Sequence, residues 1–227
     1  MRAALSVFAL FFLSAQALAV SLDDLSNKEA SGGLKEALTQ GASAAVAKLG
    51  KTDGFLGNPQ VKIPLPDGLR QAEGLMRTMG MGKQADELVT AMNRAAESAV
   101  AEAKPILVDA VKKMTVQDAK QILTGGDNSV TEYFRRTTSE QLTGKFKPIV
   151  TKATSKVKLA EKYDQFAGKG AQFGLVKEQD VKLENYVTRK ALDGLFAMIG
   201  EEEKAIRQNP VGATGSLAKK VFGALGQ

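Results

Sequence analysis

Apolar residues recur at three- and four-residue steps through most of the chain, with polar residues between them. This period places the apolar side chains on one face of an α-helix, so the pattern predicts an all-α protein. The longest stripe covers residues 130–157, and other long stripes cover residues 29–49 and 187–206. We predict a single domain, an irregular bundle of about seven to nine helices.

Prolines interrupt two of these helical patterns. Pro148 lacks an amide hydrogen and disfavours helix at the residue before it, so we expect a kink or a break in the long helix there. Pro105 marks a similar kink after the helix predicted for residues 82–104. Residues 104–110 and 147–153 both begin Lys-Pro-Ile, which fits either a duplicated kinked helix or chance.

Residues 50–66 are rich in glycine and proline, and we interpret them as a loop or arm. The segment carries too many apolar residues for a free linker, so we expect it to pack across the helices. A lid or a partner-docking arm is the functional alternative. The residues concerned are Phe55, Leu56, Val61, Ile63 and Leu65.

The sharpest turn signal precedes the longest helix. Gly125 and Gly126 are suited to a left-handed helix end, and Asp127, Asn128 and Ser129 offer side-chain oxygens to the free amides of the next helix. Helix amides and guanidinium groups together bind phosphate or carboxylate.

With Arg135 and Arg136, the residues Asp127, Asn128 and Ser129 therefore form a candidate site for an anion or a partner. The alternative is a capped junction between helices, with both arginines paired to local acids.

The first residues have the form of a secretory signal. Arg2 gives a positive start, residues 3–13 an apolar core, and Ala17-Leu18-Ala19 a small-residue cleavage site. We predict cleavage after Ala19, a periplasmic location and a mature helical domain of residues 20–227. A retained anchor is the alternative, although the apolar run is short for a membrane span.

Charge and missing residue types limit the chemistry. The formal net charge is +6, and loss of Arg2 with the signal leaves +5, spread among acids rather than grouped in blocks. Such a surface permits contact with anionic partners but does not indicate nucleic acid. The chain has no His and no Cys, which excludes Ser-His-Asp triads, Cys-His pairs and thiolate or imidazole metal sites within it. We expect no cofactor and no metal.

A last amphipathic segment follows Ser216. Its apolar side chains alternate with lysines, a pattern also found in helices that lie on membrane surfaces. The candidate membrane-facing residues are Leu217, Lys219, Lys220, Val221 and Phe222.

Several short sequence segments together resemble those of one known family. They are GLKEAL at 33–38, NP at 58–59, IPLP at 63–66, MNRAAE at 92–97, LTGGD at 123–127, YFRR at 133–136, FKPI at 146–149 and KALDGLF at 190–196. The chain resembles a family of exported bacterial helical proteins known only as a domain of unknown function (4197). The resemblance implies an all-helical envelope protein and brings no activity, ligand or site residue.

The sequence therefore favours a non-catalytic binding module for an envelope protein or an anionic ligand. Weak membrane-surface contact through the last helix is one alternative. A hydrolase that uses carboxylates or lysine is another, and it would need converging acids with raised pKa values. No pattern indicates an oligomeric state.

Overall fold

The computed structural model describes residues 27–164 and 180–209. These residues form helices and connecting turns without any strand, which confirms the predicted all-α class. Residues 158–164 are helical as well. The labelled helices are α1 (Asn27–Leu49), α2 (Asp67–Thr78), α3 (Gly82–Ala101), α4 (Lys104–Lys113), α5 (Val116–Thr124), α6 (Ser129–Thr154) and α8 (Leu183–Gln208).

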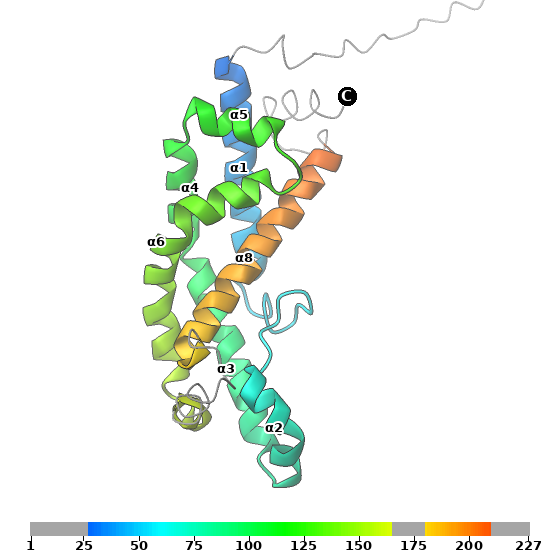
Figure 1. Ribbon diagram of the computed structural model, residues 1–227, viewed down its shortest axis with the longest axis vertical. Coiled ribbons are helices and arrows are strands. Elements are labelled where there is room, and N and C mark those ends of the chain that lie inside the picture. The colour runs from blue at the N-terminus through cyan, green and yellow to red at the C-terminus, as the bar shows by residue number, and fades with distance from the viewer. Residues whose placement is uncertain (1–26, 165–179, 210–227) are drawn as a thin grey trace, which may run out of the picture.

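The helices form an elongated bundle built around α8 (Figure 1). Helix α8 packs against α1, α3 and α6, and α3 also packs against α6. Helices α4 and α5 lie against α1 and α6 at one end, while α2 packs on α3 at the other end. The two long helices α6 and α8, which pack on each other, therefore join the remaining helices into one bundle.

The core is built from the predicted stripes. On α6, Phe134, Leu142 and Phe146 are completely buried, and on α8 Leu195 and Phe196 lie against them in the same core. Each large apolar side chain buried in this way contributes about 1.5–3 kcal/mol to folding. On α1 the buried positions are mostly small, which lets neighbouring helices approach closely: Leu34, Ala37, Leu38, Ala42, Ala45, Val46 and Leu49.

Helix ends follow the local chemistry in two places. Thr115 and Asp118 form a capping box at the start of α5, in which the Thr115 hydroxyl accepts from the Asp118 amide at 3.1 Å. The reciprocal bonds satisfy two backbone amides that would otherwise lack a partner at the helix start. Gly80, between α2 and α3, has φ of +76°, a backbone conformation that favours glycine.

The two prolines behave differently from each other. Helix α6 continues through Pro148, so it is not broken there, and the alternative of a kink stays a prediction. Pro105 instead stands in the first turn of a new helix, α4, where its missing amide hydrogen costs nothing. The similar segments 104–110 and 147–153 are both helical, but the first begins a helix and the second lies inside one.

The arm at residues 50–66 packs across the helices, as expected. Phe55, Val61, Ile63 and Leu65 are buried, and Leu56 is partly buried. A partner could reach the four buried side chains only if the arm left the core. Phe55 lies against Gly194 of α8, where a Cβ would come within 2.6 Å of its ring.

Two polar side chains of α3 hold this arm in place. Glu97 is buried and accepts hydrogen bonds from the backbone amides of Phe55 and Leu56, both at 3.1 Å. Arg94 pairs with Glu97 at 2.7 Å and with Asp53 at 2.8 Å. The contacts of Glu97 satisfy backbone amides of Phe55 and Leu56 that the arm would otherwise bury unpaired.

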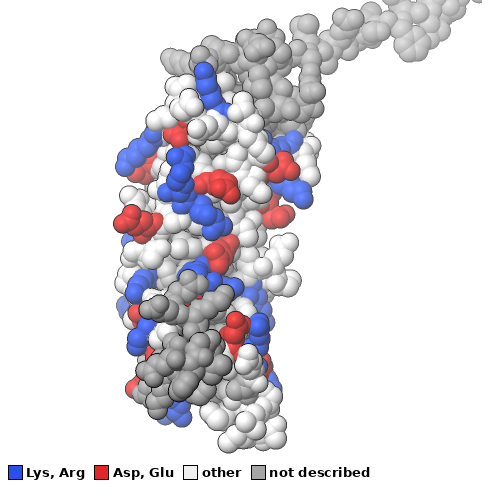
Figure 2. All heavy atoms as spheres, in the orientation of Figure 1, with Lys and Arg blue, Asp and Glu red and all other residues white. Residues whose placement is uncertain are grey.

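Basic and acidic side chains are interspersed over the face shown in Figure 2. This distribution agrees with the mixed charge pattern of the sequence. The apolar side chains most exposed among the described residues are Leu75 and Met79 of α2, at 65% and 68%, and Val116 at 55%.

Candidate functional site

The turn between α5 and α6 is shaped by a close approach of the chain to itself. Gly125 is extended, with φ of −82° and ψ of 168°, so the left-handed conformation expected for it is wrong. A Cβ on Gly125 would lie 2.7 Å from the Cβ of Ser129 and 2.7 Å from the carbonyl oxygen of Gln121. Glycine is needed here because there is no room for a side chain.

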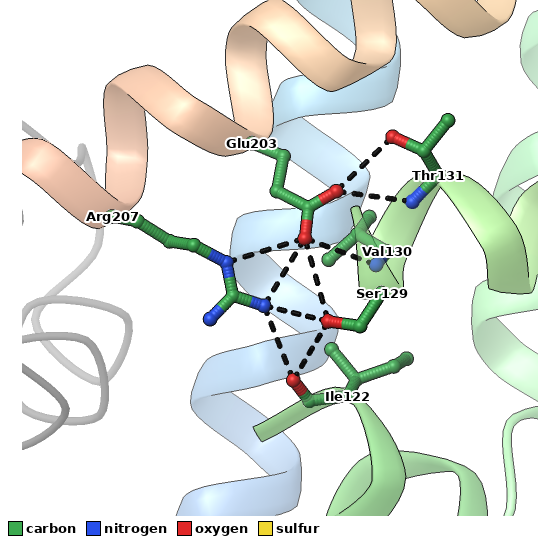
Figure 3. A network of polar contacts seen from close by, with 6 residues as sticks. All are labelled: Ile122, Ser129, Val130, Thr131, Glu203 and Arg207. Carbon is green, nitrogen blue, oxygen red and sulfur yellow. Dashed lines mark hydrogen bonds and ion pairs between the residues drawn. The ribbon is translucent and has the colours of Figure 1, made fainter. Parts of the chain in front are cut away.

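The first turn of α6 is capped by a carboxylate from α8. Glu203 accepts hydrogen bonds from the backbone amides of Val130 and Thr131, each at 3.1 Å, and from the Thr131 hydroxyl (Figure 3). The expected cap by Asn128 is wrong, because its side chain makes no capping hydrogen bond. A carboxylate is favourable at this position because helix N-terminal amides carry a partial positive charge.

Arg207, one helical turn after Glu203, neutralises this carboxylate. Its Nε and one terminal nitrogen donate to Glu203 at 3.2 and 3.1 Å. The same terminal nitrogen donates to the Ser129 hydroxyl at 2.7 Å and to the carbonyl oxygen of Ile122 at 3.1 Å (Figure 3). The side chains of Glu203 and Arg207 are only 1% and 14% exposed, so the charges are paired and hydrogen-bonded away from water.

The start of α6 therefore does bind an anionic group together with a guanidinium group, but both groups belong to the chain itself. Glu203 occupies the amides, and the guanidinium beside it belongs to Arg207 rather than to Arg135 or Arg136. Sequence reasoning misses Glu203 because three successive acids, residues 201–203, are typical of a solvated helix face. Its position in the helix could have indicated burial: Glu203 lies four residues after the buried Ile199 and seven after Phe196, on the same face of α8.

Arg135 and Arg136 are exposed and face local acids. Arg136 donates to Asp118 at 3.0 Å. Arg135 lies 3.9 Å from Asp193, and its guanidinium stands 4.7 Å from the centre of the Phe196 ring, a cation–π contact. The structure thus separates the two arginines, which the sequence treats as one pair.

An open hollow of about 560 Å³ lies between α6 and α8, and we call it the α6–α8 hollow. Three of the five predicted binding residues line it, Asp127, Asn128 and Arg135. Ser129 belongs to the Glu203 network instead, and Arg136 pairs with Asp118 at the start of α5. The charged side chains that line the hollow are Asp127, Glu132, Arg135, Asp193, Glu201 and Lys204, four acids and two bases.

The shifted carboxyl pKa values result from hydrogen bonds and ion pairs. The Thr115 hydroxyl, then its amide and Arg136, hold the pKa of the Asp118 carboxyl below its ordinary value. A hydrogen bond from Arg77 lowers the pKa of Asp86 in the same way. Both shifts are opposite to what a general acid near neutral pH requires. The described residues contain no cluster of acids that could hold a metal ion.

The candidate membrane-facing residues Leu217, Lys219, Lys220, Val221 and Phe222 lie outside the described residues. Within the described ranges, every helix is too short or too polar to span a bilayer. Surface association through the last segment therefore stays a prediction.

Comparison with known proteins gives one match. A family model described as "Protein of unknown function (DUF4197)" matches residues 24–223. No curated protein and no solved structure matches the chain.

Proposed function

The chain belongs to the DUF4197 family of proteins of unknown function, and on that premise we propose that it is a non-catalytic binding protein of the cell envelope. Its partner binds in the α6–α8 hollow. The observation that carries the proposal is the hollow itself, which is open, about 560 Å³ in volume and lined by charged side chains from both helices.

The partner is a protein segment with net positive charge. Four acids and two bases line the hollow, so its own charge is negative although the whole chain is basic. Our expectation of an anionic partner depended on free helix amides and two free arginines. Glu203 occupies those amides, and Arg136 is paired with Asp118. Complementary charge across an interface mainly raises the association rate and the specificity.

Export to the periplasm is part of the proposal. It is supported by the sequence of residues 1–19, and the family match begins after them, at residue 24. Expression of the whole chain, cell fractionation and N-terminal sequencing would test it. The expected product is periplasmic and begins at Val20. A product that keeps Met1 in the cytoplasm would contradict export without affecting the binding surface.

The binding surface is tested by two variants that remove the same charge. Glu132 and Glu201 line the hollow, whereas Glu87 and Glu140 are exposed elsewhere, and none of the four forms an ion pair in the described part of the chain. We expect Glu132→Gln/Glu201→Gln to reduce capture of an envelope partner about tenfold, while Glu87→Gln/Glu140→Gln leaves it unchanged. Capture is measured with purified mature protein on native envelope extract, by quantitative mass spectrometry.

Equal capture by both double variants would exclude the α6–α8 hollow as the binding surface. A third variant, Arg135→Ala/Arg136→Ala, tests the sign of the partner's charge. If this variant alone lost the partner, the partner would be anionic and the proposed complementarity would be wrong. Unchanged circular dichroism of each variant ensures that binding, rather than folding, is compared.

A further inference from the structure

A second hollow, of about 320 Å³, lies further along the same two helices and is separate from the α6–α8 hollow. Its residues come from the second half of α6 and the first half of α8: Thr143, Lys147, Asn185, Thr188, Arg189 and Leu192. Its volume lies at the lower end of the range for small-molecule sites, about 300–1,000 Å³. Both of its charged lining residues are basic.

Thr188 gives the first sign that this hollow is a site. The residue is 97% buried, being 3% exposed, and its hydroxyl is the single buried side-chain polar atom among the described residues that has no hydrogen-bond partner. Threonines on the facing helix behave differently: Thr143 and Thr151 donate to the carbonyl four residues earlier, at 2.7 and 2.9 Å. A buried hydroxyl without a partner costs stability, so its retention requires an explanation.

The other polar groups of this hollow keep donors that form no short hydrogen bond among the described residues. Arg189 directs Nε and one terminal nitrogen at Asp180, at 2.7–3.2 Å, while its other terminal nitrogen forms only a longer ion pair, 3.6 Å from Asp193. Lys147 likewise forms an ion pair with Glu184 at 3.7 Å, beyond hydrogen-bond distance. The Asn185 side chain forms no hydrogen bond within the described part of the chain.

We propose that this hollow binds a small organic molecule through an anionic oxygen headgroup, a carboxylate or a phosphate. Lys147 and the terminal nitrogen of Arg189 that stands 3.6 Å from Asp193 supply charge-assisted donors, and the Asn185 amide and Thr188 hydroxyl supply neutral ones. Leu192 offers an apolar contact to the rest of the molecule. The site is independent of the partner-binding hollow, so either can be wrong without the other.

Three probes distinguish the headgroups: inorganic phosphate, acetate and succinate. Each is titrated into the ¹⁵N-labelled mature chain at constant ionic strength and followed by amide chemical shifts. We expect saturable shifts from at least one probe at residues 143–147 and 185–192. Saturation by phosphate alone identifies a phosphate group, and saturation by acetate or succinate identifies a carboxylate. If none of the three probes saturates, the proposal is overturned.

Two variants test the assigned residues. Lys147→Gln should raise the dissociation constant at least tenfold, while Lys145→Gln, which removes an exposed lysine two residues away, should not change it. Thr188→Val should also raise it at least tenfold. This variant should unfold at the same temperature as the native chain or higher, because the hydroxyl it removes has no partner. Unchanged binding in both Lys147→Gln and Thr188→Val would overturn the assignment.

Discussion

The side chain of Asn93 forms two hydrogen bonds with the backbone of Ile63. The Ile63 amide donates to Asn93 Oδ1 at 2.8 Å, and Asn93 Nδ2 donates to the Ile63 carbonyl oxygen at 2.9 Å. Both residues are buried, so the carboxamide replaces the neighbouring strand that an extended segment would otherwise need. The arm is thus fixed to α3 by side chains where it has no helical hydrogen bonds.

Replacing Asn93 by Ala should therefore destabilise the protein strongly. Two buried backbone groups of Ile63 lose their partner, and at about 1–3 kcal/mol for each group we expect a loss of about 2–6 kcal/mol. Urea unfolding followed by circular dichroism measures the change. Gln84→Ala, at an exposed position of the same helix, is the control and should stay within about 0.5 kcal/mol of the native chain.

Replacing Glu203 by Ala should be similarly costly. The change leaves the first amides of α6 without their cap and removes the buried carboxylate that pairs with Arg207. Removing one partner of a buried pair costs about 3–5 kcal/mol. The same unfolding measurement on Glu201→Ala, an exposed neighbour, should show almost no change. Equal losses in the two variants would mean that the network does not stabilise the fold.

Two glycines in long helices should respond to alanine in opposite directions. At Gly194 a Cβ would lie 2.6 Å from the Phe55 ring, so Gly194→Ala should cost about 1–3 kcal/mol through overpacking. At Gly144 no atom lies within 4 Å of the added Cβ, so Gly144→Ala should stabilise by up to about 1 kcal/mol. Thermal unfolding of both variants decides this. Stabilisation by Gly194→Ala would show that the arm can move away from α8.

Lowering the pH should weaken the capping box of α5 and reduce its contribution to stability. The folded-state pKa of Asp118 is lowered, so its contribution is present above the ordinary value of 3.8 and is lost as the pH falls through the folded-state pKa. Asp118→Ala should cost about 1 kcal/mol at pH 6, and the difference from the native chain should shrink below pH 3.8. Asp127→Ala, whose carboxylate makes no contact in the described ranges, is the control.

The sequence predicted the helices but not the polar groups that join them. Periodicity finds the stripes on α1, α6 and α8, since burial of one helix face is a local pattern. Asn93, Glu97 and Glu203 occupy stripe positions, yet the backbone amides that donate to them lie at least 30 residues away in the sequence. Because no local rule connects such residues, the sequence assigned the capping of α6 to its own neighbours Asp127, Asn128 and Ser129.

The predicted binding site shows the same limit. Asp127, Asn128 and Arg135 do line one hollow, because turn and helix register bring them to one side of α6. The residues that set the hollow's charge, Asp193 and Glu201, come from α8, and only the packing of α8 on α6 brings them there. The sequence therefore located three of the residues that line the hollow, but not the acids of α8 that make its lining negative.

The three tyrosines of the chain should ionise only when the fold opens. All are buried and donate to backbone carbonyls: Tyr133 to Ala110, Tyr163 to Asp180 and Tyr186 to Pro64. Burial raises all three pKa values above 10, that of Tyr186 to about 12. The folded state therefore keeps its phenol protons longer than the unfolded state, and this stabilisation, complete below pH 10, is lost as the pH rises towards 12.

An alkaline titration measures this directly, because the chain has no Trp and its near-ultraviolet absorbance comes mainly from tyrosine. We expect little tyrosinate at pH 10 while the helical circular dichroism is native. Absorbance and helix content should then change together, since opening the bundle frees the phenols. In urea the unfolded chain should titrate near pH 10. A tyrosine that ionises at pH 10 with the helices intact would show that its burial or its hydrogen bond is wrong.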